Sequence, residues 1–154
     1  MDPLTTLLEQ AEADRNRALA TFNQTRARSD AARTQAAQLD AYRLDYQQRW
    51  SAQFARGAGL DIVRCYQGFA DRLETAIAQQ SHALTQAQAA QAQAGAALAA
   101  QELRVASVRK LIERRVQAQR QAADRREQKA DDEHAMRVAQ AKTHRKPGSN
   151  GVRA

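Results

Sequence analysis

Gly57-Ala58-Gly59 is the one strong break in a sequence that otherwise has helical periodicity almost from end to end. On both sides of it, apolar residues recur at alternating spacings of three and four, which is the pattern of an α-helical coiled coil. The two prolines, Pro3 and Pro147, lie near the ends, where they need not interrupt a helix. Two long helices joined by one short loop pack most simply against each other in opposite directions. We therefore expect an all-α fold, an antiparallel coiled-coil hairpin.

The two predicted helices differ in length. The first covers about residues 4–55 and the second about residues 61–144, with a loop at 56–60. At 1.5 Å per residue they would be about 78 Å and about 126 Å long. We expect residues 1–144 to form a single domain and residues 145–154 to form a disordered tail.

The composition favours long helices over a globular core. Alanine, glutamine, arginine, glutamate and leucine dominate, and aromatic residues make up only 5% of the chain. Residues 75–101 carry no formal charge, but seven glutamines there argue against a membrane span. The single cysteine, Cys65, excludes an intrachain disulfide and favours a reducing compartment. No secretory signal is predicted at the N-terminus.

The heptad positions of both helices can be assigned separately. In the first helix the a positions are Leu8, Arg15, Phe22, Ser29, Ala36, Arg43 and Trp50, and the d positions are Leu4, Ala11, Ala18, Thr25, Ala32, Leu39 and Tyr46. In the second helix the a positions are Val63, Ala70, Ile77, Leu84, Gln91, Leu98, Val105 and Ile112, and the d positions are Tyr66, Leu73, Gln80, Ala87, Ala94, Gln101 and Val108.

One loop length brings the two seams face to face. The predicted layers pair Leu4 with Ile112, Leu8 with Val108, Ala11 with Val105, Phe22 with Ala94, Leu39 with Ile77 and Trp50 with Tyr66. Polar residues interrupt the seam, so we expect a marginally stable, flexible rod. We expect its firmest end to be the aromatic layers beside the loop. Residues 113–144 then extend past the first helix without a partner in the chain, and alone this overhang should fray.

The sequence contains no constellation of catalytic or metal-binding residues. No phosphate-binding loop follows Gly57-Ala58-Gly59. The three histidines, His82, His134 and His144, are too far apart on a rod to share a metal ion. We therefore predict a protein that is not an enzyme and that carries neither a metal nor another cofactor.

The net charge of +7 comes entirely from the C-terminal third. Residues 1–100 hold ten basic and ten acidic residues, whereas residues 101–154 hold fourteen basic and seven acidic ones. Such a segment is compatible with nucleic acid, acidic lipid or an acidic protein surface. Nucleic acid is the weaker interpretation because basic helices enter the major groove as dimeric forks, and no aromatic residues interleave with the charges here.

Three stretches together give the chain a family resemblance. They are Leu39-x-x-Tyr42-x-x-x-Tyr46 before the loop, Tyr66-Gln67-x-Phe69-x-x-x-Leu73-x-x-Ala76-Ile77 after it, and the charged run Arg125-Arg126-Glu127-Gln128-Lys129-x-x-Asp132-Glu133. In order, spacing and loop position, the chain resembles the flagellar export protein FliJ family over about residues 4–140. The resemblance implies an antiparallel coiled coil shaped like the central stalk of rotary ATPases.

The resemblance also implies a function. It implies a non-enzymatic component of the flagellar type III export apparatus that couples the ring of the export ATPase FliI to the export gate protein FlhA and assists export chaperones. The protein would be cytoplasmic, monomeric when free, and held by its partners at the inner face of the membrane at the flagellar base. The gate-contacting positions of the family correspond to Phe69, Leu73, Ala76 and Gln80, the last in place of a histidine. Phe69 lies beside the seam, where a large apolar side chain stays partly exposed and can anchor a partner.

Geometry suggests a second surface, at the end of the hairpin opposite the loop. An apolar tip with basic flanks could sit in the pore of an ATPase ring, so we predict that the ATPase-facing residues are Leu4, Leu8, Arg109, Lys110, Ile112, Arg114 and Arg115. Two alternatives remain open: the stalk of a virulence-type type III secretion system, and a basic nucleic-acid-binding or scaffold coiled coil.

Overall fold

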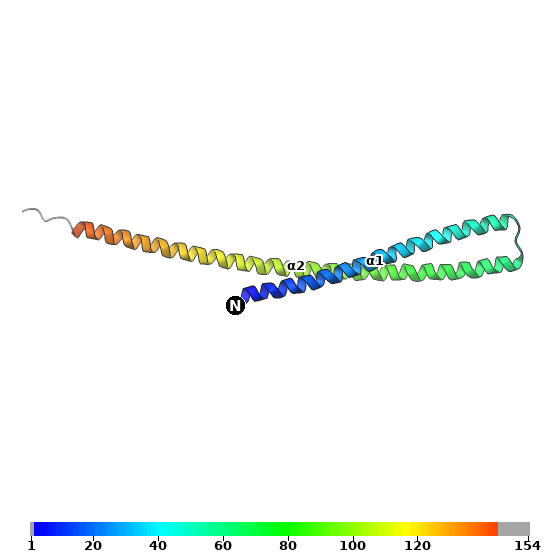
Figure 1. The fold of residues 1–154 in the computed structure, drawn as a ribbon, viewed down its shortest axis with the longest axis horizontal. Helices are drawn as coiled ribbons and strands as arrows, with labels where there is room; N and C mark the ends of the chain where they lie inside the picture. The colour runs from blue at the N-terminus through cyan, green and yellow to red at the C-terminus, as the bar shows by residue number, and fades with distance from the viewer. Residues whose placement is uncertain (1, 145–154) are drawn as a thin grey trace, which may run out of the picture.

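The computed structural model describes residues 2–144, which form two helices and no strand. Helix α1 spans Pro3–Ala55 (53 residues) and helix α2 spans Leu60–His144 (85 residues). They run in opposite directions and wind about each other, and α2 continues well past the beginning of α1 (Figure 1). The predicted all-α hairpin with a longer second helix is confirmed. The predicted disordered tail, residues 145–154, lies outside the described residues.

Helix α1 begins one residue earlier than predicted because Asp2 caps it. The Oδ1 atom of Asp2 accepts a hydrogen bond from the backbone N–H of Leu4 at 3.1 Å, and Pro3 occupies the first helical position. A carboxylate at this place satisfies an amide that has no partner within the helix. Proline there loses no helical hydrogen bond, because that N–H would be unpaired anyway.

The loop is four residues long and depends on one glycine. Gly57 has φ +88°, a left-handed conformation that side chains with a Cβ rarely adopt. The N–H groups of Arg56 and Gly57 donate to the carbonyls of Gln53 and Phe54, which closes the last turn of α1. The carbonyl of Gly59 accepts from the N–H of Val63 at 3.2 Å and so begins α2. The break predicted from Gly57-Ala58-Gly59 is thus confirmed.

The two helices meet along the predicted seam. Every predicted a and d position of both helices is buried or half-buried, whereas almost all other positions are exposed. The layers have the expected register. Gly95, next to Ala94, has the ring of Phe22 against it, since a Cβ added at Gly95 would lie 3.3 Å from that ring. A large side chain therefore faces small ones, which lets the helices approach closely.

Burial is deepest at the open end of the hairpin, where α1 begins. Ala11 (0% exposed), Val105 (2%) and Val108 (5%) form a buried cluster, with Leu7, Leu8 and Ile112 packed against it. At the loop end the aromatic side chains are only half-buried. Two helices alone cannot enclose large rings, whereas alanine opposite valine closes the gap between backbones. The best-buried layers therefore lie at the end opposite the one expected to be firmest.

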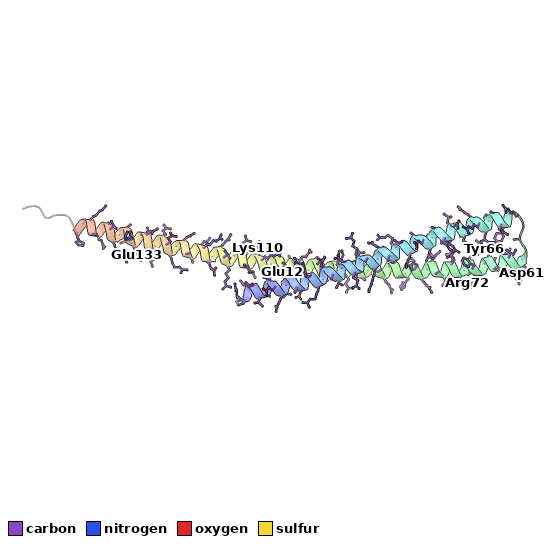
Figure 2. All side chains as sticks on the ribbon, in the orientation of Figure 1. Glu12, Asp61, Tyr66, Arg72, Lys110 and Glu133 are labelled. Atoms are coloured by element: carbon purple, nitrogen blue, oxygen red, sulfur yellow. The ribbon has the colours of Figure 1, made fainter. Side chains whose placement is uncertain are left out.

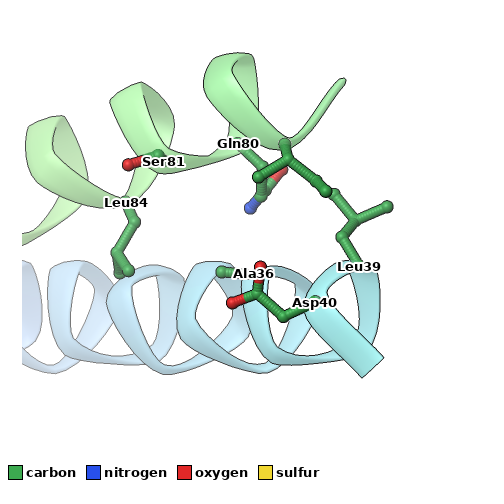
Figure 3. Close-up of a pocket in the computed structure, with 7 residues that line it drawn as sticks. Ala36, Leu39, Asp40, Gln80, Ser81 and Leu84 are labelled. Atoms are coloured by element: carbon green, nitrogen blue, oxygen red, sulfur yellow. The ribbon is translucent and has the colours of Figure 1, made fainter. Parts of the chain in front are cut away.

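Between the buried cluster and the aromatic layers, the seam is polar and loosely packed. The hydroxyl of Ser29 and Oε1 of Gln101 are buried and have no hydrogen-bond partner within the described residues. A cavity of about 220 Å³ opens between the helices beside Leu39 and Leu84. Gln80 crosses toward α1 there (Figure 3), and its Nε2 donates to the carbonyl of Ala32 at 3.2 Å. These features weaken the seam, because buried polar groups without partners oppose folding.

Beyond Ile112 helix α2 packs against no other helix of residues 2–144, although Arg115 still forms an ion pair with Asp2, just before α1. Of residues 113–144, which we call the overhang, all are exposed except Ala122, which is half-buried. Figure 2 shows Glu133 far past the beginning of α1, where α2 runs alone. The overhang is about 48 Å long at 1.5 Å per residue. Neither helix contains a segment apolar enough to cross a membrane.

Candidate binding surfaces

The first candidate surface, the Phe69 patch, consists of Phe69, Leu73, Ala76 and Gln80. These residues follow one another at helical spacing and lie on one face of α2. The ring of Phe69 lies against two tyrosines of α1, with centroids 4.4 Å from Tyr46 and 6.2 Å from Tyr42. Because it is only half-buried, Phe69 still presents apolar surface to solvent.

The other three residues of the patch are less available than Phe69. Leu73 is 8% exposed, so most of its surface faces the seam. Ala76 and Gln80 are half-buried, and the amide of Gln80 is engaged with the backbone of α1. The accessible part of the patch therefore consists mainly of Phe69 and Ala76.

Tyr42 is a neighbour of the patch that the sequence analysis did not include. Tyr42 is 48% exposed, and its ring stands edge-on to that of Phe69. A groove of about 420 Å³ begins at Tyr42, and its lining residues are Gln35, Gln38, Leu39, Tyr42 and Gln80. The heptad pattern does indicate Tyr42, because this residue precedes the a position Arg43 and so lies beside the seam, as Phe69 does. The exposed surface therefore includes residues of both helices.

Ring packing holds this surface in place. Tyr46 contacts the rings of Tyr42, Trp50, Tyr66 and Phe69, with centroid separations between 4.4 and 6.3 Å. Aromatic pairs at such separations contribute roughly 0.5–1.5 kcal/mol each beyond the burial of their area. Tyr46 thus fixes Phe69 and Tyr42 relative to each other across the two helices.

The second candidate surface lies at the open end, and its apolar members belong to the seam. Leu4, Leu8 and Ile112 are half-buried. Leu8 and Ile112 pack on the cluster of Ala11, Val105 and Val108. Their first role is to hold α1 on α2, which leaves limited apolar area at this end for another protein.

Ion pairs divide the four basic residues of this surface into two groups. The guanidinium of Arg109 lies 3.0 Å from Oε1 of Glu12, and that of Arg115 lies 2.9 Å from Oδ1 of Asp2. Both arginines therefore link α2 to α1. Lys110 and Arg114 are exposed and form no ion pair within residues 2–144, so their charges are available to a partner.

A shallow groove of about 290 Å³ accompanies the two free cations. Ser107, Lys110, Leu111 and Arg114 line it. Leu111 is 49% exposed. The sequence analysis missed Leu111 because it lies outside the seam, yet large exposed apolar side chains beside free cations are typical of binding surfaces. We call this the Lys110 surface.

Histidine, cysteine and carboxylate side chains are scattered along the two helices. No group of three histidine, cysteine, aspartate or glutamate side chains within residues 2–144 could hold a metal ion. Cys65 is an exposed thiol on α2 near the loop. The two candidate surfaces differ in chemistry, with aromatic rings near the loop and exposed cations near the open end.

Comparison with known proteins agrees with this architecture. No curated protein matches the sequence. A family model described as flagellar FliJ protein matches residues 1–144, which is nearly the whole chain. The resemblance noted in the sequence is thereby confirmed: the chain belongs to the FliJ family, a family of non-catalytic components related to flagellar protein export.

Proposed function

We propose that this protein couples the ring of the flagellar export ATPase, FliI, to the export gate protein FlhA, and that it assists export chaperones in delivering substrates. It would work in the cytoplasm, held by its partners at the inner face of the membrane. One observation carries the proposal. The rod has two surfaces of different chemistry, the Phe69 patch and the Lys110 surface, about 60 Å apart along α2 at 1.5 Å per residue.

The Phe69 patch is proposed to bind the export gate. Phe69, Ala76 and the adjacent Tyr42 give it aromatic and apolar area at low conformational cost, because Tyr46 already orders the rings. Aromatic anchors of this kind dominate binding energy in many interfaces. Leu73 and Gln80 would act indirectly, by fixing the helix that carries Phe69.

The open end is proposed to bind the ATPase ring. Lys110 and Arg114 supply charges that no carboxylate of the described residues neutralises, and Leu111 supplies apolar area. Such a surface suits a pore whose loops carry carboxylates or exposed carbonyl oxygens. Arg109 and Arg115 would contribute by keeping α1 on α2 at this end.

The two surfaces can be separated by measuring stimulation of the purified ATPase. We expect truncation after residue 112 to abolish stimulation, because it removes Arg114 and the whole overhang, and Phe69→Ala to leave stimulation largely intact. Lys110→Glu with Arg114→Glu should also reduce stimulation. The matched control is Arg26→Glu with Arg28→Glu, which changes net charge equally at exposed positions in the middle of α1.

Binding to the purified cytoplasmic part of the gate protein should give the opposite pattern. Phe69→Ala and Tyr42→Ala should each weaken it about tenfold or more, as expected for aromatic anchors. The Lys110 and Arg114 variant should bind the gate normally. The proposal fails if the Lys110 and Arg114 variant stimulates the ATPase as the unmodified protein does, or if Phe69→Ala does not affect gate binding.

A further inference from the structure

An eleven-residue repeat runs along the C-terminal half of α2. Arginine recurs at Arg104, Arg115, Arg126 and Arg137. Eleven residues make slightly more than three helical turns, so residues at this spacing stay close to one face of a helix. The four arginines, which we call the arginine stripe, therefore form one line along α2 that begins inside the hairpin and continues onto the overhang.

The first half of the arginine stripe is already occupied. Arg104 lies 2.9 Å from Oδ2 of Asp14, and Arg115 lies 2.9 Å from Oδ1 of Asp2. Asp14 of α1 and its N-cap residue Asp2 are twelve residues apart, close to the eleven that separate the two arginines. The first two arginines of the stripe thus pair with two carboxylates set at nearly the same interval on the other arm of the hairpin.

The second half of the stripe has the same chemistry but no occupant. Arg126 and Arg137 are exposed and have no ion pair within the described part of the chain. The one interaction seen for the Arg126 side chain is a hydrogen bond from its Nε to the carbonyl of Ala122, at 3.4 Å in its own helix.

An apolar line accompanies the stripe onto the overhang. Each of Arg104, Arg115 and Arg137 is followed by a valine: Val105 is 2% exposed in the seam, whereas Val116 is 39% and Val138 is 41% exposed on the overhang. Ala123 and Ala130 continue this line between the two exposed valines at spacings of seven and eight residues. The overhang therefore carries an apolar line like the one that α1 covers within the hairpin, but with fewer large side chains.

We propose that the overhang binds an acidic amphipathic helix of a partner protein, laid end to end with α1 along the same face of α2. The partner helix would place carboxylates eleven or twelve residues apart against Arg126 and Arg137 and small apolar side chains against Val116 and Val138. Continuity with the α1–α2 interface and charge complementarity both favour this occupant. This binding does not depend on the proposed function, because the Lys110 surface faces another side of α2.

Two other occupants fit the face less well. A second copy of the overhang would set arginine stripe against arginine stripe, and like charges at that distance repel. Nucleic acid would meet Asp131, Asp132 and Glu133 in the middle of the overhang, and these carboxylates repel phosphates. A helix can avoid this repulsion by placing a cation opposite the acidic residues.

A peptide with the sequence of the beginning of α1 can serve as the probe for this binding. A fluorescein-labelled peptide of residues 2–23, stapled on its solvent face to hold it helical, carries Asp2 and Asp14 at the required spacing. In the hairpin these residues pair with Arg115 and Arg104. If the peptide binds 22 residues, or two repeats, farther along α2, then Asp14 lies at Arg126 and Asp2 lies at Arg137, and the peptide does not overlap α1. In the hairpin Glu12 pairs with Arg109. Two repeats farther along α2 the corresponding residue is Asp131, which would repel Glu12, so the peptide carries Glu12→Lys.

The measurement is fluorescence anisotropy of this peptide titrated with the full-length protein. We expect saturable binding that Arg126→Glu with Arg137→Glu weakens by about fivefold or more, since two exposed charge pairs are reversed. The matched control is Arg114→Glu with Arg125→Glu, which changes net charge equally on the side of α2 opposite the valines and should shift binding by less than about twofold. Circular dichroism should give the same helicity for both variants.

Three results would overturn the inference. The first is no saturable binding at millimolar protein, and the second is equal weakening by both pairs of substitutions, which is the behaviour of nonspecific charge attraction. The third is self-association in sedimentation velocity that only the Arg126 and Arg137 variant abolishes, because a second copy would then be the occupant.

Discussion

Ser29 occupies an a position of α1 and is completely buried, yet its hydroxyl has no hydrogen-bond partner in the described structure. Replacing it with alanine keeps nearly the same volume and removes the unpaired polar atom. Most substitutions in a core destabilise a protein. We expect Ser29→Ala to do the opposite.

Two contributions should raise the free energy of unfolding of the Ser29→Ala variant. A buried polar group without a partner costs roughly 1–3 kcal/mol, and alanine exceeds serine in helix propensity by about 0.5 kcal/mol. Loss of the oxygen atom leaves a small void that offsets part of the gain. The free energy of unfolding should therefore rise by about 1–2 kcal/mol, which corresponds to a rise in Tm of roughly 3–6 °C for a chain of this size.

The assay is urea and thermal unfolding followed by circular dichroism at the helix band. Ser107→Ala is the matched control, because Ser107 is exposed and its hydroxyl donates to the carbonyl of Leu103 at 2.9 Å. The control gains the same helix propensity but releases no buried polar group, so its change should stay below about 0.5 kcal/mol. A lower Tm for Ser29→Ala, or a gain no larger than that of Ser107→Ala, would refute the reasoning.

Three further predictions concern stability and use the same unfolding assay. Val105→Ala should lower the free energy of unfolding by about 2 kcal/mol, because the side chain is 2% exposed in the best-packed cluster; a change below 0.5 kcal/mol, on the order of surface substitutions, would contradict the assigned core. Gly57→Ala should cost about 1 kcal/mol because of the positive φ of Gly57, whereas Gly59→Ala should be nearly neutral; equal effects would argue against the turn. Asp14→Asn removes two partly exposed ion pairs, with Arg104 of α2 and with Arg17 of α1, and should cost no more than about 1 kcal/mol. That loss should shrink in 1 M salt, and a loss that does not depend on salt would mean that Asp14 acts through packing.

The seam could be predicted from sequence because two separate constraints fix it. The 3.5-residue period sets which side of each helix faces the other, and the position of the loop sets how the helices align along their length. Leu8, Ala11, Val105 and Val108 accordingly meet as expected. Neither constraint depends on the details of side-chain conformation.

The ring contacts could not be predicted in this way. Phe69 packs on Tyr42 and Tyr46, and its position depends on the rotamers of all three rings, which the heptad pattern does not specify. The depth of burial also escaped prediction. Large rings suggest a firm core, but between only two helices they stay half-exposed, whereas Ala11 opposite Val105 is fully enclosed.

The candidate sites illustrate a conflict between two kinds of inference. The family resemblance implies that Leu73 contacts the gate, while the heptad pattern assigns it to the seam, and its 8% exposure agrees with the heptad pattern. Similarly, the basic pattern of α2 predicts that Arg109 and Arg115 face a partner protein, whereas both form ion pairs within the hairpin. Their partners, Glu12 and Asp2, lie about a hundred residues earlier in the sequence, and only the folded register brings them together.

Helix α2 packs against the beginning of α1 and then continues alone as one unbroken helix to His144. Pulsed electron–electron double resonance can measure both features, with Cys65 replaced by serine and spin labels at the exposed positions Glu9 with Ser107 and Glu9 with Gln140. We expect a short, narrow distance distribution for the first pair, with helix axes about 10 Å apart. For the second pair we expect a distance of about 50 Å, from 33 residues at 1.5 Å each. A long distance between Glu9 and Ser107, or a short one between Glu9 and Gln140, would contradict this arrangement.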